Sequence, residues 1–300
     1  MAFVMGAMSI LMSDAINKKD KKKVGNRKQF EIKNGFEMHN RKHVSVSQIN
    51  KFREAPDAWL AQYLMGYRFP YGFAAIQGLA VENGIEQGLF NGIVDDDCVR
   101  IAIDRFKQDT TLMSGAVEAL EKREPIIRQM VEVGLEQLRD LGRPDEPPVG
   151  SKQHNIGIPI RFAEGDKGTI DCIGYLDFYY PNLDNLVVDL KTTSKAPSSW
   201  SLSHGIQAAI YKKAVEAMTQ KPCTVKFLYV LTRKKDPFVW LEMTDPDYYI
   251  ATFKRTVKQL EAMLRISSDP KDLVAVIPHN PDSFYWNDAH DIAADVYRDI

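Results

Sequence analysis

Three short segments within residues 170–211 decide the fold: Gly174-Tyr-Leu-Asp177, Val188-Asp-Leu-Lys-Thr-Thr193 and Gln207-Ala-Ala-Ile-Tyr211. The first two lie in runs rich in β-branched and aromatic residues, which favour strands. The third has helical spacing, because its glutamine and tyrosine are four residues apart and so share one face of a helix. Two strands followed by a helix are therefore expected in this stretch.

A five-residue loop, Pro181-Asn-Leu-Asp-Asn185, separates the two strands and favours an antiparallel hairpin. If the loop is symmetric about Leu183, Asp177 lies directly opposite Asp189. Lys191 follows Asp189 by two residues, so its side chain points to the same face of the sheet. The residues that point to the other face, into the core, are Leu186, Val188 and Leu190.

Opposed carboxylates on one sheet face repel each other unless a cation lies between them. Mg²⁺ takes one or two carboxylates together with phosphate oxygens. The nearby Lys191 ammonium could hold or deprotonate an attacking water and stabilise charge on a phosphate. A surface salt bridge between Asp189 and Lys191 is the competing interpretation, because an Asp-x-Lys pair on a strand is common.

A polar line runs along the following helix, where His204 lies one turn before Gln207 and Tyr211 follows four residues later. The neighbouring residues are mostly alanine, isoleucine and valine. These polar groups could contact a phosphate or orient Lys191. They could equally mark a half-solvated helix face, and spacing alone does not choose between the two.

The remaining elements are predicted from apolar periodicity. Capping-box spacing at Ser45–Gln48 begins a helix that Pro56 kinks or restarts. Further helices are expected at residues 73–90, 96–107, 112–141, 203–218, 248–265 and 288–297. Strands are expected at residues 154–162, 169–180, 186–190, 225–232 and 238–243.

This order predicts an α/β fold, more narrowly an α+β mixed sheet, in a single domain. Residues 1–42, with the Lys-rich run Lys18–Lys23, are expected to be a flexible tail. Residues 43–300 are expected to form the domain. Its parts are a helical portion at 43–145, a mixed-sheet catalytic core at 150–245 and C-terminal helices at 246–300.

Composition limits the function classes. The 300 residues carry a net charge of −1, so contact with nucleic acid must come from a local basic patch. The three cysteines form no CxxC pair, which disfavours a disulfide framework or a zinc ribbon. No apolar run reaches the roughly 18–20 residues that span a bilayer. A cytoplasmic protein with no membrane contact is expected.

The three central segments resemble, in order and spacing, the motifs of the PD-(D/E)XK nuclease superfamily. They are most similar to its RecB-like branch, which includes phage (λ-type) exonucleases. The resemblance implies a restriction-endonuclease-like core, αβββαβ, after a helical N-terminal half. Upstream, Gly78-Leu-Ala-Val-Glu82 fits the family's helical Gly-x-x-x-Glu motif, with Glu86 as the alternative acid one turn later.

The resemblance also implies the site. Lys191 would assist the nucleophilic water, and Gln207 and Tyr211 would support the site and the phosphate. Asp171 has the same strand parity as Asp177 and is expected to be peripheral. The ligands of Mg²⁺ or Mn²⁺ would be Glu82, Asp177, Asp189 and the backbone carbonyl of Leu190.

Two other cofactors are not expected, because the sequence lacks the motifs that would bind them. Ala55-Pro56 stands where relatives with an iron–sulfur cluster have Cys-Pro, so no cluster is expected. No Gly-x-x-x-x-Gly-Lys-Ser/Thr loop is present, so ATP is not expected either.

The function implied is a metal-dependent DNA exonuclease that acts on linear duplex or single-stranded ends, in phage-type or recombination and repair metabolism. A single-strand annealing or recombination protein is an expected partner, and a homo-oligomer is compatible with the family. If the chain is phage-encoded, it would act in the host cytoplasm. A structure-selective or sequence-specific endonuclease is one alternative. A catalytically inactive fold that binds DNA or protein is another.

Overall fold

The computed structural model describes residues 33–165 and 168–298, and the chain from Asn34 onward forms one compact unit. Its strands form two sheets. The three-stranded sheet has the order β1-β3-β2, where β1 is His43–Ser45, β2 is His154–Arg161 and β3 is Thr169–Leu176. The four-stranded sheet has the order β4-β5-β6-β7, where β4 is Phe178–Tyr180, β5 is Leu186–Thr193, β6 is Val225–Leu231 and β7 is Phe238–Glu242.

Both sheets are mixed. In the first, β3 pairs with β1 in parallel and with β2 in antiparallel fashion. In the second, β5 pairs with β6 in parallel, whereas β4–β5 and β6–β7 are antiparallel. The parallel β5–β6 pair requires a crossover, and one helix of 18 residues supplies it, α7 (Leu202–Thr219).

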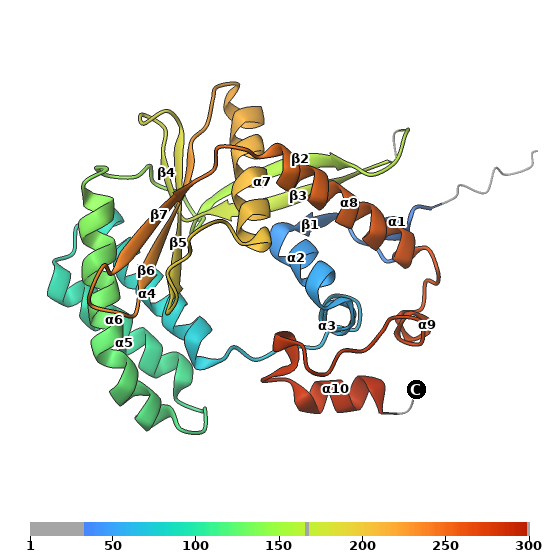
Figure 1. The fold of residues 1–300 in the computed structure, drawn as a ribbon, viewed down its shortest axis with the longest axis horizontal. Helices are drawn as coiled ribbons and strands as arrows, with labels where there is room; N and C mark the ends of the chain where they lie inside the picture. Colours follow the sequence, from blue (N-terminus) through green and yellow to red (C-terminus); the bar gives the residue numbers. More distant parts are fainter. Residues whose placement is uncertain (1–32, 166–167, 299–300) are drawn as a thin grey trace, which may run out of the picture. The chain divides into compact units, whose positions relative to one another are not determined.

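The helices lie around the two sheets, and α9 and α10 lie next to α3 (Figure 1). Those before the first long strand are α1 (Gly35–Met38), α2 (Val46–Glu54), α3 (Pro56–Tyr63), α4 (Phe73–Phe90), α5 (Asp95–Thr110) and α6 (Ala116–Arg139). Those after the last strand are α8 (Asp247–Leu264), α9 (Pro270–Val274), the 3₁₀ helix η1 (Phe284–Trp286) and α10 (His290–Tyr297).

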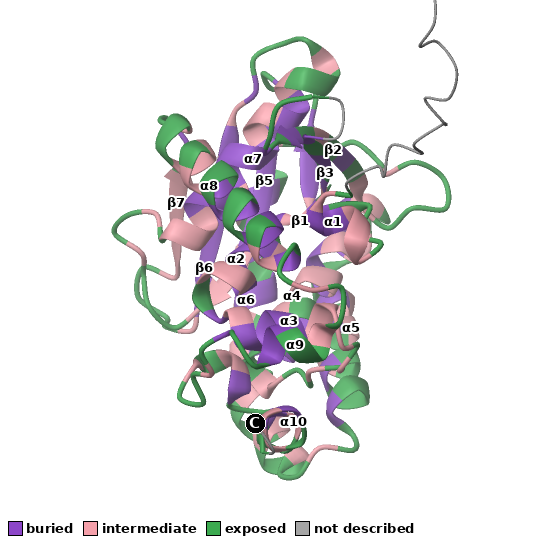
Figure 2. Cartoon of the chain, turned by 90° about the vertical axis from the view of Figure 1, so that its right-hand side faces the viewer, coloured by how far each residue is buried: buried purple, intermediate pink, exposed green. Residues whose placement is uncertain are grey.

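The four-stranded sheet is covered on both faces, so most residues of β5 and β6 are buried (Figure 2). Its Leu186, Val188 and Leu190 pack against α4, α5 and α6, as strand alternation predicts. Val187, on the opposite face, packs with α7. Asp189 and Lys191 have the parity of Val187, so they lie on the α7 side of the sheet.

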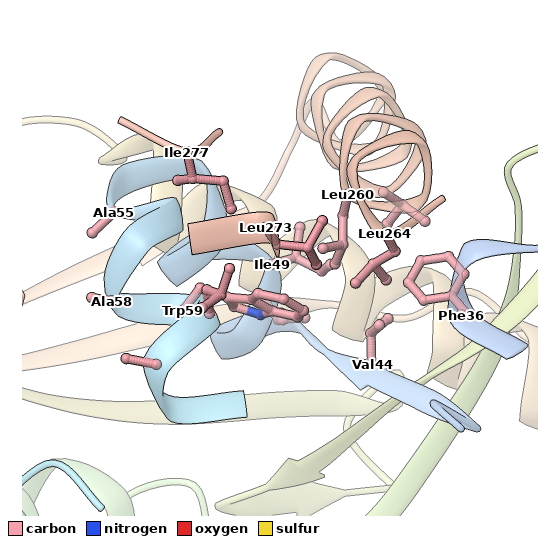
Figure 3. Packing of buried hydrophobic residues seen from close by; sticks show 14 of the residues in the cluster. Phe36, Val44, Ile49, Ala55, Ala58, Trp59, Leu260, Leu264, Leu273 and Ile277 are labelled. Atoms are coloured by element: carbon pink, nitrogen blue, oxygen red, sulfur yellow. The ribbon is translucent and has the colours of Figure 1, made fainter. Parts of the chain in front are cut away.

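A second body of packing joins both ends of the domain. Trp59 of α3 and Ile49 of α2 pack against Leu260 and Leu264 of α8 and Leu273 of α9 (Figure 3). The three-stranded sheet closes this cluster from below through buried residues of β1, β2 and β3. The C-terminal helices are therefore part of the core that positions α2 and α3.

The structure corrects the predicted strand over residues 169–180. That stretch breaks at Asp177, so β3 enters one sheet and β4 enters the other. Residues on both sides of the break favour strands, which is why the sequence pattern did not reveal it. The break creates a fork between the two sheets, with Asp177 at its base.

Most other elements lie where they were predicted, including α4 at Phe73–Phe90 and the restart of the helix at Pro56. The predicted tail ended too late, because α1 lies within it and Gly35 N donates to Glu261 Oε1 of α8 at 3.1 Å. The rest of that tail, residues 1–32, lies outside the described residues. The elements that were not predicted are α1, β1, α9 and η1.

The capping-box prediction at Ser45–Gln48 is half right. Ser45 Oγ accepts a hydrogen bond from Gln48 N at 3.3 Å, as an N-cap should. The Gln48 side chain instead accepts from Arg41 at 2.8 Å. Among the described helices, none is both long enough and apolar enough to cross a membrane.

Candidate active site

The hairpin register places the two central aspartates at the fork. β4 pairs with β5 as Phe178 with Val188 and onward, which is symmetric about Leu183 as predicted. Asp177 comes directly before Phe178 and Asp189 directly after Val188, so the two aspartates flank the pair that lies farthest from the turn. At this point Asp177 Oδ2 accepts a hydrogen bond from Leu190 N at 3.0 Å. The side-chain carboxylate of Asp177 thus accepts the hydrogen bond that a backbone carbonyl would accept if the β4–β5 ladder continued.

Asp189 is almost fully buried, at 1% exposure. Its Oδ2 forms an ion pair with Lys191 Nζ, and its Oδ1 accepts from Gln207 Nε2 at 2.9 Å. Gln207 Nε2 also donates to the Tyr211 hydroxyl at 3.0 Å. The polar line on α7 is therefore turned onto the aspartate, which decides against the interpretation of a merely solvated helix face. The Asp189–Lys191 pair is likewise not a surface salt bridge.

Glu82 reaches the same cluster from α4, through a residue that the sequence did not suggest. Gln153 Nε2 donates to Glu82 Oε1 at 3.1 Å and to Asp177 Oδ1 at 3.0 Å. Gln153 lies in the loop just before β2, which has no periodic pattern. An amide donor thus bridges two carboxylates that would otherwise repel each other.

Two motif glycines allow these elements to approach closely. A Cβ at Gly78 would lie 3.0 Å from Thr192 Oγ1, so glycine lets α4 pack near the end of β5. A Cβ at Gly174 would lie 2.9 Å from Tyr211 Cε1, so glycine makes room for the phenol ring beside β3. Both glycines belong to the sequence segments that predicted the site.

Burial and repulsion between the carboxylates dominate the electrostatics of the cluster, and Lys191 only partly opposes them. Burial raises the pKa of Asp177 well above its usual range, and Asp189 and Glu82 raise it further. Burial also raises the pKa of Asp189, although Lys191 opposes the shift. Burial, Glu86 and Asp189 together raise the pKa of Glu82 to about 7. Bringing a cation to the cluster would favour the ionised forms.

The donor set fits a hard divalent cation, although it is not a preformed cage. Among the described residues, no three His, Cys, Asp or Glu side chains are close enough to hold a metal ion as they stand. The Gln153 amide and the Lys191 ammonium instead contact the carboxylates, where positive charge is needed. Asp189 Oδ2 is buried and accepts no hydrogen bond of good geometry beyond its ion pair. Carboxylate oxygens crowded in this way are the ligands that Mg²⁺ and Mn²⁺ prefer.

The other residues considered in the sequence either lie outside the cluster or have a role that stays a prediction. Asp171 is exposed on β3. Leu190 contributes its N–H to Asp177, and a metal-binding role for its carbonyl stays a prediction. His204 hydrogen-bonds to the Tyr229 hydroxyl at 2.8 Å, and burial lowers its pKa to about 4, so it faces the site as a neutral ring.

The family model of the PD-(D/E)XK nuclease superfamily matches residues 43–274, so the chain belongs to this superfamily. Its members generally use divalent metals such as Mg²⁺ or Mn²⁺, and DNA is the substrate that a nuclease fold implies. The mixed sheets, the crossover helix α7 and the fork at Asp177 form the restriction-endonuclease-like core of this class.

The solved structures that are similar to this chain include the following two. One is described as "Putative exonuclease" from Eubacterium rectale, at 16% identity and a TM-score of 0.49, covering 75% of this chain and 81% of that chain. The other, SSO0001, has 17% identity and a TM-score of 0.32, covering 64% of this chain and 87% of that one. No curated protein sequence matches the chain.

Glu82 and Glu86 both lie on α4, but only Glu82 bonds to the Gln153 bridge. We therefore expect Glu82→Gln to lower the rate of DNA cleavage by at least about 100-fold, because the resemblance implies that Glu82 holds the metal ion, whose charge stabilisation is worth several kcal/mol. Glu86→Gln, a matched change one helical turn away, should lower it by less than about fivefold. Cleavage rates in Mg²⁺ at saturating DNA measure both. Equal losses in the two variants would remove the preference for Glu82.

Proposed function

We propose that this chain is a Mg²⁺- or Mn²⁺-dependent exodeoxyribonuclease that hydrolyses phosphodiester bonds at DNA ends. The observation that carries the proposal is the buried Asp189, held between Lys191 on its own strand and Gln207 on α7, next to Asp177 at the fork. A surface salt bridge would need none of this burial, because exposed pairs contribute little to stability. A chemical role accounts for the free energy that burial of the Asp189 carboxylate costs.

The residues divide the work of hydrolysis. Glu82, Asp177 and Asp189 would hold the metal ion, which when bound would polarise the phosphate and activate a water. The Lys191 ammonium would donate to the attacking water or to a phosphate oxygen that gains charge. Gln207 fixes the rotamer of Asp189, and Tyr211 fixes Gln207 in turn. Gln153 keeps Glu82 and Asp177 together.

Two alternatives remain testable against this proposal. A structure-selective or sequence-specific endonuclease could use the same cluster, and the two differ only in whether a free end is needed. An inactive DNA- or protein-binding fold would have no physical reason to bury opposed carboxylates, because each costs free energy to desolvate. Roles in recombination, repair or phage metabolism, a partner that anneals single strands, and assembly into a homo-oligomer are proposals that follow from the family resemblance.

The proposal is tested with a linear duplex labelled at one end and a covalently closed circle of the same sequence. With Mg²⁺, we expect digestion of the linear DNA and none of the circle, and Asp189→Ala should remove the activity. Ca²⁺ should support DNA binding without cleavage, because its larger, flexible coordination does not hold the reacting groups in one geometry.

Each outcome points to one candidate. Cleavage of the closed circle would favour the endonuclease. No cleavage of any DNA by the wild type in Mg²⁺ or Mn²⁺ would favour the inactive fold. Protecting each end of the linear duplex in turn would then show the direction of digestion.

A further inference from the structure

A cavity of about 650 Å³ opens beside the catalytic cluster, on the side of α7 that carries Gln207. Its walls come from α2, α3, the segment that links α3 to α4, the start of α7 and the segment around η1; in Figure 1 the two segments lie near each other. We call it the aromatic cavity. The lining residues that matter here are Asn50, Lys51, Tyr71, Gln207, Phe284 and Tyr285.

Lys51 is buried in the wall of the aromatic cavity, at 6% exposure. Its ammonium lies 3.8 Å from the ring centre of Phe69 and 4.9 Å from that of Tyr285, and it donates to Gln62 Oε1. Within the described part of the chain it forms no ion pair with a carboxylate. Burial lowers its pKa to about 8, which Asp57 only partly offsets. An anion in the cavity would supply the missing counter-charge.

Aromatic faces and an unpaired acceptor accompany this lysine. Phe284 is 80% exposed and Tyr71 is 67% exposed, although both belong to the same concave surface. Asn50 is 8% exposed, and its Oδ1 is buried without a hydrogen-bond partner. Flat rings, a hydrogen-bond acceptor and a cation are the groups that hold the base and phosphate of a single-stranded nucleotide.

We propose that the aromatic cavity holds an unpaired nucleotide of the DNA strand that the catalytic cluster cleaves, with its base against Tyr71 and Phe284 and its phosphate beside Lys51. The inference rests on the proposed nuclease function, because Gln207 lines the cavity and also binds Asp189. A volume of this size is typical of small-ligand sites.

Two carboxylates, Glu54 and Asp288, also line the cavity. Glu54 is already occupied, because it pairs with Arg53 and accepts from Ser203 Oγ and from the Tyr285 hydroxyl. Asp288 is exposed, so solvent screens its charge. Among the described residues, Lys51 thus remains a buried cation that forms no ion pair with a carboxylate, and Asp57 only partly offsets the effect of its burial.

Binding of a short oligothymidylate that carries 2-aminopurine at one end tests the proposal. The assay is run in EDTA, where no metal-dependent cleavage takes place, so its result is independent of the nuclease assay. We expect the fluorescence of 2-aminopurine to be quenched in the complex with wild type. Phe284→Ala and Tyr71→Ala should each weaken binding by at least about fivefold and reduce the quench, since one base–aromatic stack is lost.

Matched variants separate this site from general surface contacts. Tyr248→Ala removes an aromatic that is 62% exposed on α8, outside the cavity, and should bind like wild type. Lys51→Met should weaken binding and lower the slope of log affinity against log salt by about one. Thermal unfolding checks that each variant is folded. If Lys51→Met does not fold, the test still rests on Phe284→Ala, because Phe284 is exposed.

Replacing the labelled base with an abasic residue should weaken binding to wild type but cause no further loss in Phe284→Ala. Unchanged affinity and quench in both aromatic variants would overturn the proposal, even if the protein degrades DNA. Loss of quench in those variants would support it, even if no cleavage is found.

Discussion

Lys191→Ala should lower kcat for DNA hydrolysis by about 10²–10⁴-fold, the usual range for a group that handles protons or charge at the reacting phosphate. The Lys191 ammonium is paired with Asp189 at the fork and lies on the same sheet face. Its removal deletes the positive charge but leaves all three carboxylates. Binding of Mn²⁺, measured by calorimetry, should therefore persist while turnover is lost.

The same substitution leaves Asp189 buried without its cation, so the metal-free variant should unfold at a lower temperature than wild type. Mn²⁺ should raise the unfolding temperature of the variant by more than it raises that of the wild type. Lys226→Ala is the matched control: Lys226 lies on the adjacent strand β6 and pairs with Glu242 on the surface. It should change neither turnover nor the response to metal. Turnover that survives Lys191→Ala would exclude Lys191 from the mechanism.

The sequence predicted the parts of the site that depend on short-range rules. Strand alternation placed Asp189 and Lys191 on one face, and loop symmetry gave the register that brings Asp177 beside Asp189. The four-residue spacing on α7 aligned Gln207 with Tyr211. Each rule needs only neighbours along the chain, or across one tight hairpin, so a single sequence was enough.

What the sequence did not show depends on contacts between distant segments. Gln153 bridges carboxylates 71 and 24 residues away, and no local pattern marks it. The break at Asp177 is set by the competition of two sheets for one run of strand-forming residues. The aromatic cavity combines Lys51, Tyr71 and Phe284, whose proximity follows only from the packing of the C-terminal segment onto α2 and α3.

Asp57 ties that C-terminal segment to the start of α3. It is fully buried, and its Oδ2 accepts from His279 Nδ1 at 2.9 Å, from Asn280 N at 2.8 Å and from Trp286 Nε1 at 2.9 Å. Its Oδ1 accepts from Ala58 N at 2.8 Å. One carboxylate thus satisfies several buried donors, and η1, which carries Phe284, lies within the segment that it holds.

Asp57→Ala should lower the free energy of unfolding by on the order of 3 kcal/mol, because buried donors lose their acceptor and each costs about 1–3 kcal/mol when unpaired. Urea unfolding measures the loss. Asp282→Ala, an exposed aspartate in the same segment, should change stability by less than about 0.5 kcal/mol.

The loss should not be spread evenly over the domain. Amide hydrogen exchange should become faster first in the segment from residue 275 to the end of α10, since Asp57 is the main polar anchor of that segment. The amides of β5 and α7 should stay protected. Binding of the single-stranded oligonucleotide should then weaken together with this local opening, while Mn²⁺ binding at Asp177 and Asp189 is retained. A variant with wild-type stability would show that the Asp57 network does not hold the cavity wall in place.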